Sequence, residues 1–348
     1  MNITLGLICG DSGRTKSLSK LALYSAFSHL DGGNGKNSDK FNVKRVLIID
    51  QSKDKSVLRM ATRLFGTSKV LEVTPSAWDV LKLPPMRNGS YATYFKFDIF
   101  NCAKENEIIL YLDADTIINR QFSKTLIKNL FRNTQTCLLM APSLRPVYER
   151  IGYYKDSNRL IYYNAGVIFY KSKDKFNMGK FKIFIRDYLR SNLKIDWHDQ
   201  DLINAYFNES IIALPPEYNL STGYLRKELN KESGINYLLR ERFQNPYILH
   251  ASGGSLFKQN HIYPFKSYFI KQLNSMIKDT SKLRSMEINE MVALRNVIAY
   301  RGSWMRQLIN KFRMLFGVTP ECHPDYYKES HYKYKIRKIM NSLLIIKE

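Results

Sequence analysis

The chain has 348 residues, of which 44% are hydrophobic and 13% aromatic. This composition excludes wholesale disorder and is enough for one large α/β domain with an appendage, or for two modest domains. Lysine and arginine outnumber aspartate and glutamate by 54 to 31, a formal net charge of +23. Such a charge favours an anionic partner (nucleic acid, an acidic membrane face or a phosphorylated substrate), although a lysine-rich surface that only aids solubility is the simpler alternative.

The predicted elements alternate between short β-rich runs and helical stretches up to about residue 250. In chain order we expect a strand at 3–9, a helix at 17–30, a strand at 46–50, a helix at 57–65, a strand at 70–73, a helix at 91–102, and strands at 108–112, 136–140, 166–170 and 211–214. This alternation predicts an α/β fold with a mainly parallel sheet flanked by helices. Ligands of such sheets bind beyond the carboxyl ends of the strands.

After about residue 266 the strand signals stop, and we expect a catalytic domain over 1–265 and a basic, mainly helical region over 266–348. In residues 298–316, Trp304, Leu308, Lys311 and Leu315 share one helical stripe. This pattern predicts a helix that lies on an anionic membrane, and a helix that packs on the catalytic domain is the alternative. We expect no nucleic-acid partner, because no helix-turn-helix, zinc-finger or RNA-recognition signature is present.

The four cysteines, Cys9, Cys102, Cys137 and Cys322, lack the spacings typical of zinc sites. Cys9 and Cys137 lie in apolar runs, which predicts buried thiols in a reducing compartment. The first eleven residues do not resemble a signal peptide, and no apolar run approaches the roughly 18 residues that cross a bilayer. We therefore expect a cytoplasmic protein, held peripherally on the inner face of the cytoplasmic membrane.

The clearest chemical signal is the apolar run 108–112, which ends in Asp113-Ala114-Asp115-Thr116. Two carboxylates at the exit of a buried strand suit Mg²⁺ or Mn²⁺, and such an ion can neutralise a diphosphate. Two alternatives remain at this point. Asp115 could instead cap a following helix, or Asp113 could be the nucleophile of a haloacid-dehalogenase-like phosphatase, which uses a similar Asp-x-Asp-x-Thr string.

Four later motifs follow in order: Tyr163-Asn164-Ala165-Gly166, Trp197-His198-Asp199-Gln200-Asp201, Leu214-Pro215-Pro216-Glu217-Tyr218-Asn219 and Ile248-Leu249-His250-Ala251-Ser252-Gly253-Gly254. Together with the run at 108–116 they resemble family 8 of the glycosyltransferases, whose members are retaining enzymes of the GT-A fold. The resemblance extends from about Asp50 to Gly254, and it includes Ser90–Lys96 as the helix that precedes the metal strand.

The resemblance implies a Mn²⁺ site formed by Asp113, Asp115 and His250, and an imidazole ligand favours Mn²⁺ over Mg²⁺. It also implies that Asn164, Asp199 and Gln200 surround the donor sugar. There the amide oxygen of Gln200 would face an oxocarbenium-like transition state. Asp199 has a structural alternative, because it could act only as a helix cap.

The resemblance further implies that Asp11 meets the uracil of a UDP-sugar and that Lys96, Gly253 and Lys258 lie near its diphosphate. Asp50 is a weaker candidate for contact with the donor. The sequence departs from the family in three places. Lys96 stands where an arginine is usual, and Ser12–Lys16 differs from the family's pattern. After His250 the family's Lys-Pro-Trp is absent, and Lys258 comes two residues later than the family's lysine.

The implied function is transfer of galactose or glucose from UDP-galactose or UDP-glucose to a cell-surface glycolipid or polysaccharide. The alternatives are the phosphatase and a transferase-like binding protein with weak or no activity.

Overall fold

The computed structural model describes residues 1–31, 41–86, 89–132, 137–143, 162–172, 176–191, 195–221, 246–252, 256, 266–279 and 281–300. The chain forms two compact units. The first comprises residues 1–224 and 234–250, and the second comprises residues 225–233 and 251–348. All elements described below belong to the first unit, except α9 and α10.

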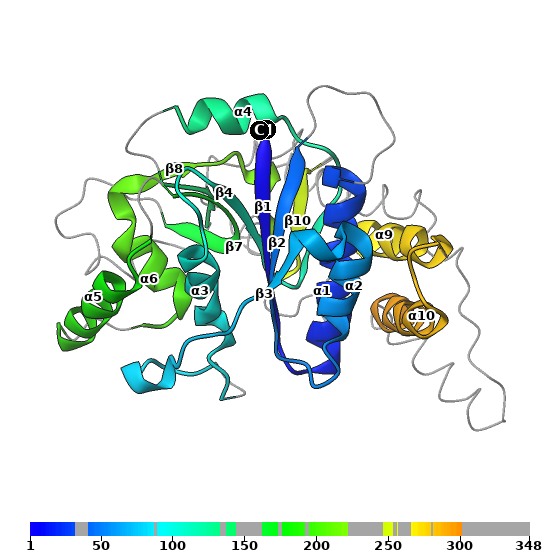
Figure 1. Ribbon diagram of the computed structural model, residues 1–348, viewed down its shortest axis with the longest axis horizontal. Coiled ribbons are helices and arrows are strands. Elements are labelled where there is room, and N and C mark those ends of the chain that lie inside the picture. The colour runs from blue at the N-terminus through cyan, green and yellow to red at the C-terminus, as the bar shows by residue number, and fades with distance from the viewer. Residues whose placement is uncertain are drawn as a thin grey trace, which may run out of the picture. The chain divides into compact units, whose positions relative to one another are not determined.

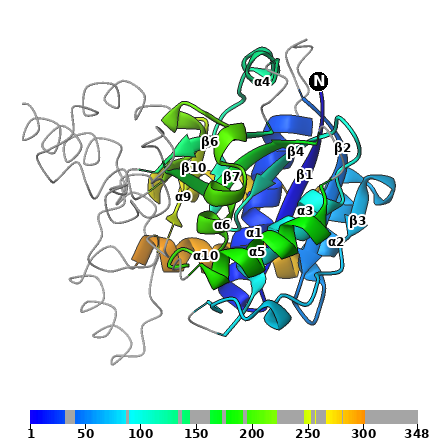
Figure 2. The ribbon, with the colours of Figure 1, turned by 90° about the vertical axis from the view of Figure 1, so that its left-hand side faces the viewer.

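A seven-stranded sheet, in the order β3-β2-β1-β4-β7-β6-β8, forms the centre of the first unit (Figures 1 and 2). Its strands are β1 (Asn2–Cys9), β2 (Asn42–Asp50), β3 (Val70–Glu72), β4 (Ile108–Leu112), β6 (Leu138–Pro142), β7 (Tyr163–Lys171) and β8 (Ile211–Ala213). β7 is antiparallel to both of its neighbours, and the other pairs are parallel. The expected mainly parallel sheet is therefore confirmed. The reversal of β7 brings its first residues to the edge at which β4 ends.

Helices cover both faces of this sheet, which explains why its central strands are mostly apolar. α1 (Gly13–Ala26) and α2 (Ser56–Phe65) lie on one side, and α3 (Lys96–Asn101), α5 (Met178–Arg190) and α6 (Asp199–Tyr206) lie on the other (Figure 1). α4 (Lys124–Leu130) lies between β4 and β6 in the chain. Short 3₁₀ segments connect the elements: η2 (Thr67–Lys69), η3 (Asp79–Leu81), η6 (Asn208–Ser210) and η7 (Pro216–Tyr218).

Two helices differ from the prediction at their ends. α1 begins at Gly13 rather than at residue 17, because the Ser12 side chain caps it by accepting the N–H of Thr15 at 3.1 Å. The helix then changes to a π-helical turn, η1 (Phe27–Asp31). The helix expected over 91–102 begins as the 3₁₀ segment η4 (Ala92–Phe95) and becomes α-helical at Lys96.

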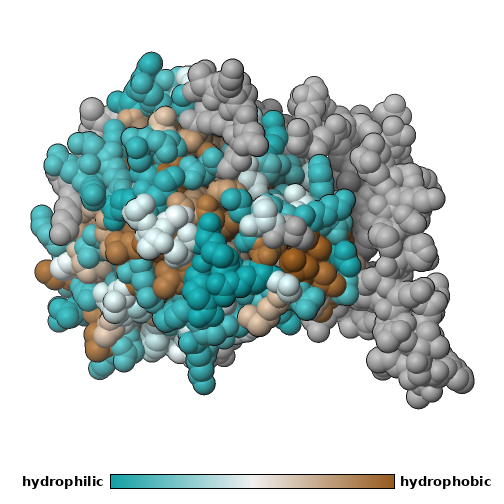
Figure 3. Space-filling view, turned by 45° about the vertical axis from the view of Figure 1, so that its right-hand side comes forward, coloured by the Kyte–Doolittle hydropathy of each residue, from teal (hydrophilic) through white to brown (hydrophobic). Residues whose placement is uncertain are grey.

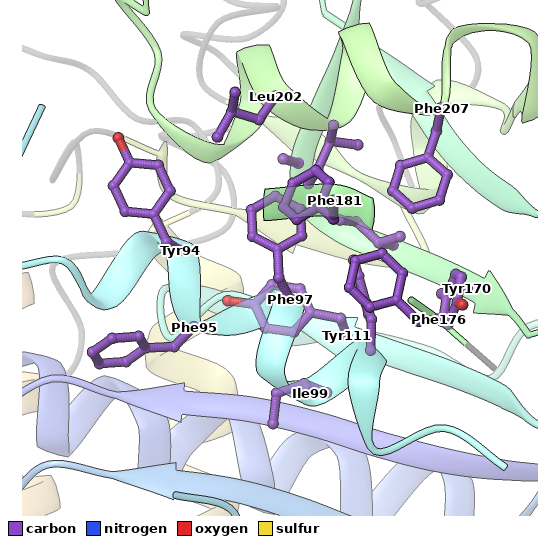
Figure 4. Packing of buried hydrophobic residues seen from close by; sticks show 14 of the residues in the cluster. Tyr94, Phe95, Phe97, Ile99, Tyr111, Tyr170, Phe176, Phe181, Leu202 and Phe207 are labelled. Carbon is purple, nitrogen blue, oxygen red and sulfur yellow. The ribbon is translucent and has the colours of Figure 1, made fainter. Parts of the chain in front are cut away.

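An aromatic core fills the space between the sheet and α3, α5 and α6 (Figure 4). Phe97 and Phe181 lie with their ring centroids 4.3 Å apart, and Phe100 lies 4.7 Å from Tyr170. All four rings are almost fully buried. Burying each such ring stabilises the fold by about 1.5–3 kcal/mol. This packing fixes α3 and α6, whose first residues face the candidate active site described next.

A second, three-stranded sheet in the order β5-β10-β9 lies beside the end of β4. β5 (Thr116–Ile118) pairs antiparallel with β10 (Ile248–His250), which pairs parallel with β9 (Leu220–Ser221). Their register places His250 opposite Thr116 and beside Ser221. Three distant segments of sequence are thereby joined by backbone hydrogen bonds.

The second unit contains α9 (Lys266–Lys278) and α10 (Ser285–Tyr300), which contact each other. The helical character expected from residue 266 is confirmed as far as Tyr300. The stripe of Trp304, Leu308, Lys311 and Leu315 lies outside the described residues.

The described surface in Figure 3 is largely hydrophilic, with hydrophobic residues in separate patches. Among the helices that are described, none combines the length and the apolar character needed to cross a membrane. Cys9 is a buried thiol, as expected, whereas Cys137 is only partly buried. Cys322 lies outside the described residues.

Candidate active site

The tight turn between β4 and β5 carries Asp113 and Asp115. The N–H and the hydroxyl of Thr116 both donate to the Asp113 carbonyl, at 3.1 and 2.7 Å, and close this turn. The N–H of Asp113 donates to the Gly166 carbonyl at 2.8 Å, which fixes the turn to β7. Asp115 is followed by a strand, not a helix. The helix-cap interpretation of Asp115 is therefore wrong.

His250, at the end of β10, faces both carboxylates. Its Nε2 lies 3.3 Å from Asp115 Oδ1 and 3.7 Å from Asp113 Oδ2, and the residue is only 4% exposed. Burial alone would lower the pKa of His250, but the two carboxylates outweigh it and raise that pKa. Burial likewise favours the neutral acid of Asp115, and the facing imidazole outweighs this effect and lowers its pKa.

These three side chains fit a divalent cation. One ligand atom from each of Asp113, Asp115 and His250 lies within 4.8 Å of the other two, so all three can reach one ion. Two carboxylate oxygens and one imidazole nitrogen form a mixed donor set that suits a divalent cation. Gly166 makes this approach possible, because a Cβ at that position would overlap the His250 ring, with Nε2 only 2.8 Å away.

Lys96 links the turn that carries Asp113 and Asp115 to the start of α6. Its Nζ lies 2.5 Å from Asp199 Oδ2 and 3.6 Å from Asp113 Oδ1, and it donates to the Ala165 carbonyl at 2.9 Å. The lysine is 2% exposed. Burial disfavours the ammonium, but the two carboxylates outweigh it and raise the pKa of Lys96. Burial also raises the pKa of Asp199, against the opposing effect of Lys96. The ammonium of Lys96 is thus surrounded by oxygens of the protein itself, and its contact with the diphosphate stays a prediction.

Asp199 does not cap its own helix. Its other carboxylate oxygen accepts the hydroxyl of Thr93, and the cap position before it is held by His198 with a positive φ of 50°. A backbone in that region is strained for an L residue, and such strain is concentrated at functional sites. Asp201 holds the turn instead, because it accepts the N–H groups of Asp196 and Trp197 at 2.8 and 2.7 Å.

Asn164 and Gln200 each accept a backbone N–H near the start of β7. The Gln200 Oε1 accepts the N–H of Ala165 at 3.1 Å, and the Asn164 Oδ1 accepts the N–H of Gly166 at 2.9 Å. Both side chains are partly exposed. The antiparallel course of β7 brings these residues next to Asp113. The structure thus brings together seven of the predicted site residues: Lys96, Asp113, Asp115, Asn164, Asp199, Gln200 and His250.

The remaining predicted residues fall into three cases. Asp11 is exposed after the end of β1, at the carboxyl edge of the sheet. Gly253 and Lys258 lie outside the described residues. The expectation that Asp50 contacts the donor is wrong. Asp50 is 3% exposed, and its Oδ2 accepts the N–H groups of Val57 and Leu58 at 3.1 and 3.0 Å. It therefore caps α2 and does not face a donor.

Three further site residues escaped the sequence analysis. Tyr111 donates its hydroxyl to Asp113 Oδ1 at 2.8 Å, Thr93 bonds Asp199, and Asn219 accepts from His250 Nδ1 over 3.1 Å. Burial raises the pKa of Tyr111 well above its usual range, which keeps its hydroxyl a donor. All three lie inside motifs visible in the sequence, but nothing in the spacing says which neighbour each one meets.

The comparisons with known proteins agree with this geometry. Residues 22–254 match the family model described as "Glycosyl transferase family 8". General stress protein A of Bacillus subtilis (strain 168) is 23% identical over 250 residues, which are 68% of this chain and 85% of that protein.

Solved structures show the same fold. An active-site mutant of LgtC matches with a TM-score of 0.56 and 17% identity, over 79% of this chain and 96% of that one. The galactosyltransferase LgtC in complex with donor and acceptor sugar analogues matches with a TM-score of 0.52 and 18% identity, over 84% and 96%. The bifunctional glycosyltransferase WbbM matches with a TM-score of 0.56 and 15% identity, over 83% of this chain and 51% of that one. The expected GT-A fold is confirmed.

Proposed function

Because the chain belongs to glycosyltransferase family 8, we propose that it is a retaining, Mn²⁺-dependent hexosyltransferase that uses UDP-galactose or UDP-glucose. The observation that carries this proposal is the group of Asp113, Asp115 and His250, whose ligand atoms lie within reach of one ion at the carboxyl end of β4. Such an ion can neutralise the diphosphate of a nucleotide-sugar, and the carboxyl edge of the sheet is where ligands of this fold class bind.

Asp113, Asp115 and His250 hold the cation in this proposal. A bound Mn²⁺ supplies charge neutralisation for the departing diphosphate. The ammonium of the neighbouring Lys96 lies 3.6 Å from the Asp113 carboxylate. Tyr111 fixes the same carboxylate through its hydroxyl at 2.8 Å. Both contacts hold Asp113 in one rotamer before any ligand arrives.

Asp199, Gln200 and Asn164 receive the donor sugar. The bond between the anomeric carbon and the diphosphate oxygen breaks, and its electron pair leaves with UDP. The acceptor hydroxyl bonds the same face of that carbon and gives its proton to the diphosphate. Gln200 offers the second lone pair of its Oε1 to the developing positive charge, because the first already accepts the N–H of Ala165 at 3.1 Å. The carboxylate of Asp199 accepts hydrogen bonds from sugar hydroxyls, and the ammonium of Lys96, 2.5 Å away, holds that carboxylate in place.

The acceptor that we propose is a cell-surface glycolipid or polysaccharide precursor, reached from the cytoplasmic side of the membrane. The net charge of +23 supports attachment to an anionic membrane surface. Three further residues complete the proposed contacts with the donor. Asp11 contacts the uracil, and Gly253 and Lys258 contact the diphosphate.

Isothermal titration tests the donor and metal assignment. We expect UDP to bind tightly only with Mn²⁺, and Asp115→Ala to remove that dependence, because a carboxylate ligand is lost. Gly13→Ala is the matched control, since a Cβ at Gly13 meets nothing within 4 Å. UDP binding that ignores both Mn²⁺ and Asp115→Ala contradicts the proposal.

The two alternatives stand differently. The phosphatase interpretation is wrong, because the family match and the fold are those of a glycosyltransferase. A transferase-like protein with weak activity is distinguished by incubating UDP-sugars with Mn²⁺ and no acceptor. We expect slow release of free sugar, and its anomeric form in the first turnovers reports on retention.

A further inference from the structure

Asn219 connects the proposed metal ligand to the proposed sugar contact. It lies between η7 and β9 and is fully buried. Its Oδ1 is 3.1 Å from His250 Nδ1, and its Nδ2 donates to Asn164 Oδ1 at 2.8 Å. Asn164 Oδ1 also accepts the N–H of Gly166 at 2.9 Å. The four residues therefore form one continuous chain of hydrogen bonds.

The direction of every bond in this chain follows from its last member. A backbone N–H can only donate, so the atom of Asn164 that faces Gly166 must be its carbonyl oxygen. The Asn219 atom that faces this same oxygen must then be the amide nitrogen. The carbonyl oxygen of Asn219 consequently faces His250, and it can only accept. The Nδ1 of His250 must therefore carry a proton.

This order fixes the neutral tautomer of His250. With the proton held on Nδ1, the lone pair of the neutral ring lies on Nε2, the nitrogen that faces Asp113 and Asp115 at 3.7 and 3.3 Å. A metal-binding histidine usually donates its other ring N–H to an oxygen that fixes the orientation and tautomer of the ring. The amide of Asn219 also donates to Asn164 Oδ1, which already accepts the N–H of Gly166. Only the NH₂ group of Asn164 is therefore left for the donor sugar, and it would donate to a sugar hydroxyl.

We propose that Asn219 is a positioning residue that holds His250 in the metal-binding tautomer and ties it to Asn164, so that the metal and donor-sugar halves of the site are ordered together. The inference rests on the proposed function, because it assigns a role toward the proposed cation. It adds a residue that contacts neither the cation nor the sugar in that function.

Metal affinity gives the first test, with Mn²⁺ alone as the probe and electron paramagnetic resonance of the free ion as the readout. Asn219→Ala should weaken binding about 10–100-fold, the range found when such an orienting partner is removed. Asn219→Asp should recover only part of that loss, because a carboxylate oxygen still accepts from Nδ1 of His250 while the N–H that donates to Asn164 Oδ1 is missing.

The matched control is Asn204→Ala. Asn204 is also a buried amide, 2% exposed, and it bonds the N–H and the carbonyl of Tyr163 and the carbonyl of Gln200 at 2.8–2.9 Å. Its removal should lower the melting temperature as Asn219→Ala does, but leave the Mn²⁺ affinity within about threefold. Equal losses of affinity in both variants would mean that Asn219 acts only through stability, which overturns the inference.

The tautomer is tested without any metal, by ¹⁵N spectra of the histidine ring at the alkaline pH where the imidazole is neutral. We expect the proton of His250 on Nδ1 in the wild-type protein and a shift toward Nε2 in Asn219→Ala. A wild-type proton on Nε2 overturns the inference even if Mn²⁺ binds. A wild-type protein that binds no Mn²⁺ but shows the Nδ1 proton instead contradicts the proposed function alone.

Discussion

Replacing Lys96 by methionine should destabilise the protein strongly, because this lysine balances two carboxylates inside it. Its Nζ is 2.5 Å from Asp199 and 3.6 Å from Asp113, and only 2% of the side chain is exposed. Methionine fills a similar volume without charge. In Lys96→Met the Asp199 carboxylate, 8% exposed, would remain buried without its counter-ion.

The size of the effect follows from this burial. Removing one partner of a buried ion pair costs about 3–5 kcal/mol, which is a large part of the roughly 5–15 kcal/mol that stabilises a typical protein. Adding Asp199→Asn to Lys96→Met should restore about 1–3 kcal/mol, because the uncompensated charge is then gone. Lys96→Arg should cost less than Lys96→Met, since it keeps the charge and the cost is limited to repacking.

Urea unfolding of the metal-free protein, followed by circular dichroism and fluorescence, measures these differences. The wild-type protein, Lys96→Met, Lys96→Arg and the double variant Lys96→Met/Asp199→Asn are compared at one pH and ionic strength. If Lys96→Met unfolds at the same urea concentration as Lys96→Arg, the charge of Lys96 does not stabilise the fold. If Asp199→Asn adds to the loss instead of relieving it, Asp199 is not the partner of this lysine.

Gly166→Ala should weaken Mn²⁺ binding at least tenfold and destabilise the fold by about 1–3 kcal/mol, because its Cβ overlaps the His250 ring; calorimetry that finds neither contradicts the packing. Burial raises the pKa of Cys9 to about 12, so the stabilising effect of its neutral thiol is complete below the unfolded pKa of about 8.5 and is lost as the pH rises toward 12. We expect Cys9 to resist labelling by a disulfide reagent at about pH 8.5 until urea unfolds the chain; mass spectrometry locates the labelled thiols. Asp50→Ala should cost about 1–2 kcal/mol, since it removes the acceptor for two N–H groups of α2; unchanged urea unfolding would refute the capping role.

Local pattern was enough to predict most elements of the sheet and its helices. The continuous apolar runs of β1, β2 and β4 need only burial on both faces, which is a property of the residues themselves. The ends of elements were less predictable, because they depend on capping contacts. α1 begins at Gly13 because Ser12 caps it, and η4 precedes α3 although the same helical spacing covers both segments.

The residue types of the site were readable for a similar reason. Asp113 and Asp115 follow an apolar run and could be proposed as ligands from their own surroundings, whereas His250 was proposed only through the resemblance to the family. Asp50 has the same signature, an aspartate after an apolar strand, and yet it caps α2. Composition cannot separate these cases, because the difference lies in which backbone donors the fold brings near each carboxylate.

By itself, the sequence determined the α/β class, the order of the strands along the chain and the chemical identity of the donor atoms. The tertiary structure alone decided that β7 runs antiparallel and that β10 pairs with β5, and these two facts bring Asn164 and His250 to Asp113. It also decided that Asn219 directs the imidazole. Strand pairing and amide orientation are set by hydrogen bonds between segments that lie far apart in the chain, and local spacing carries no information about them.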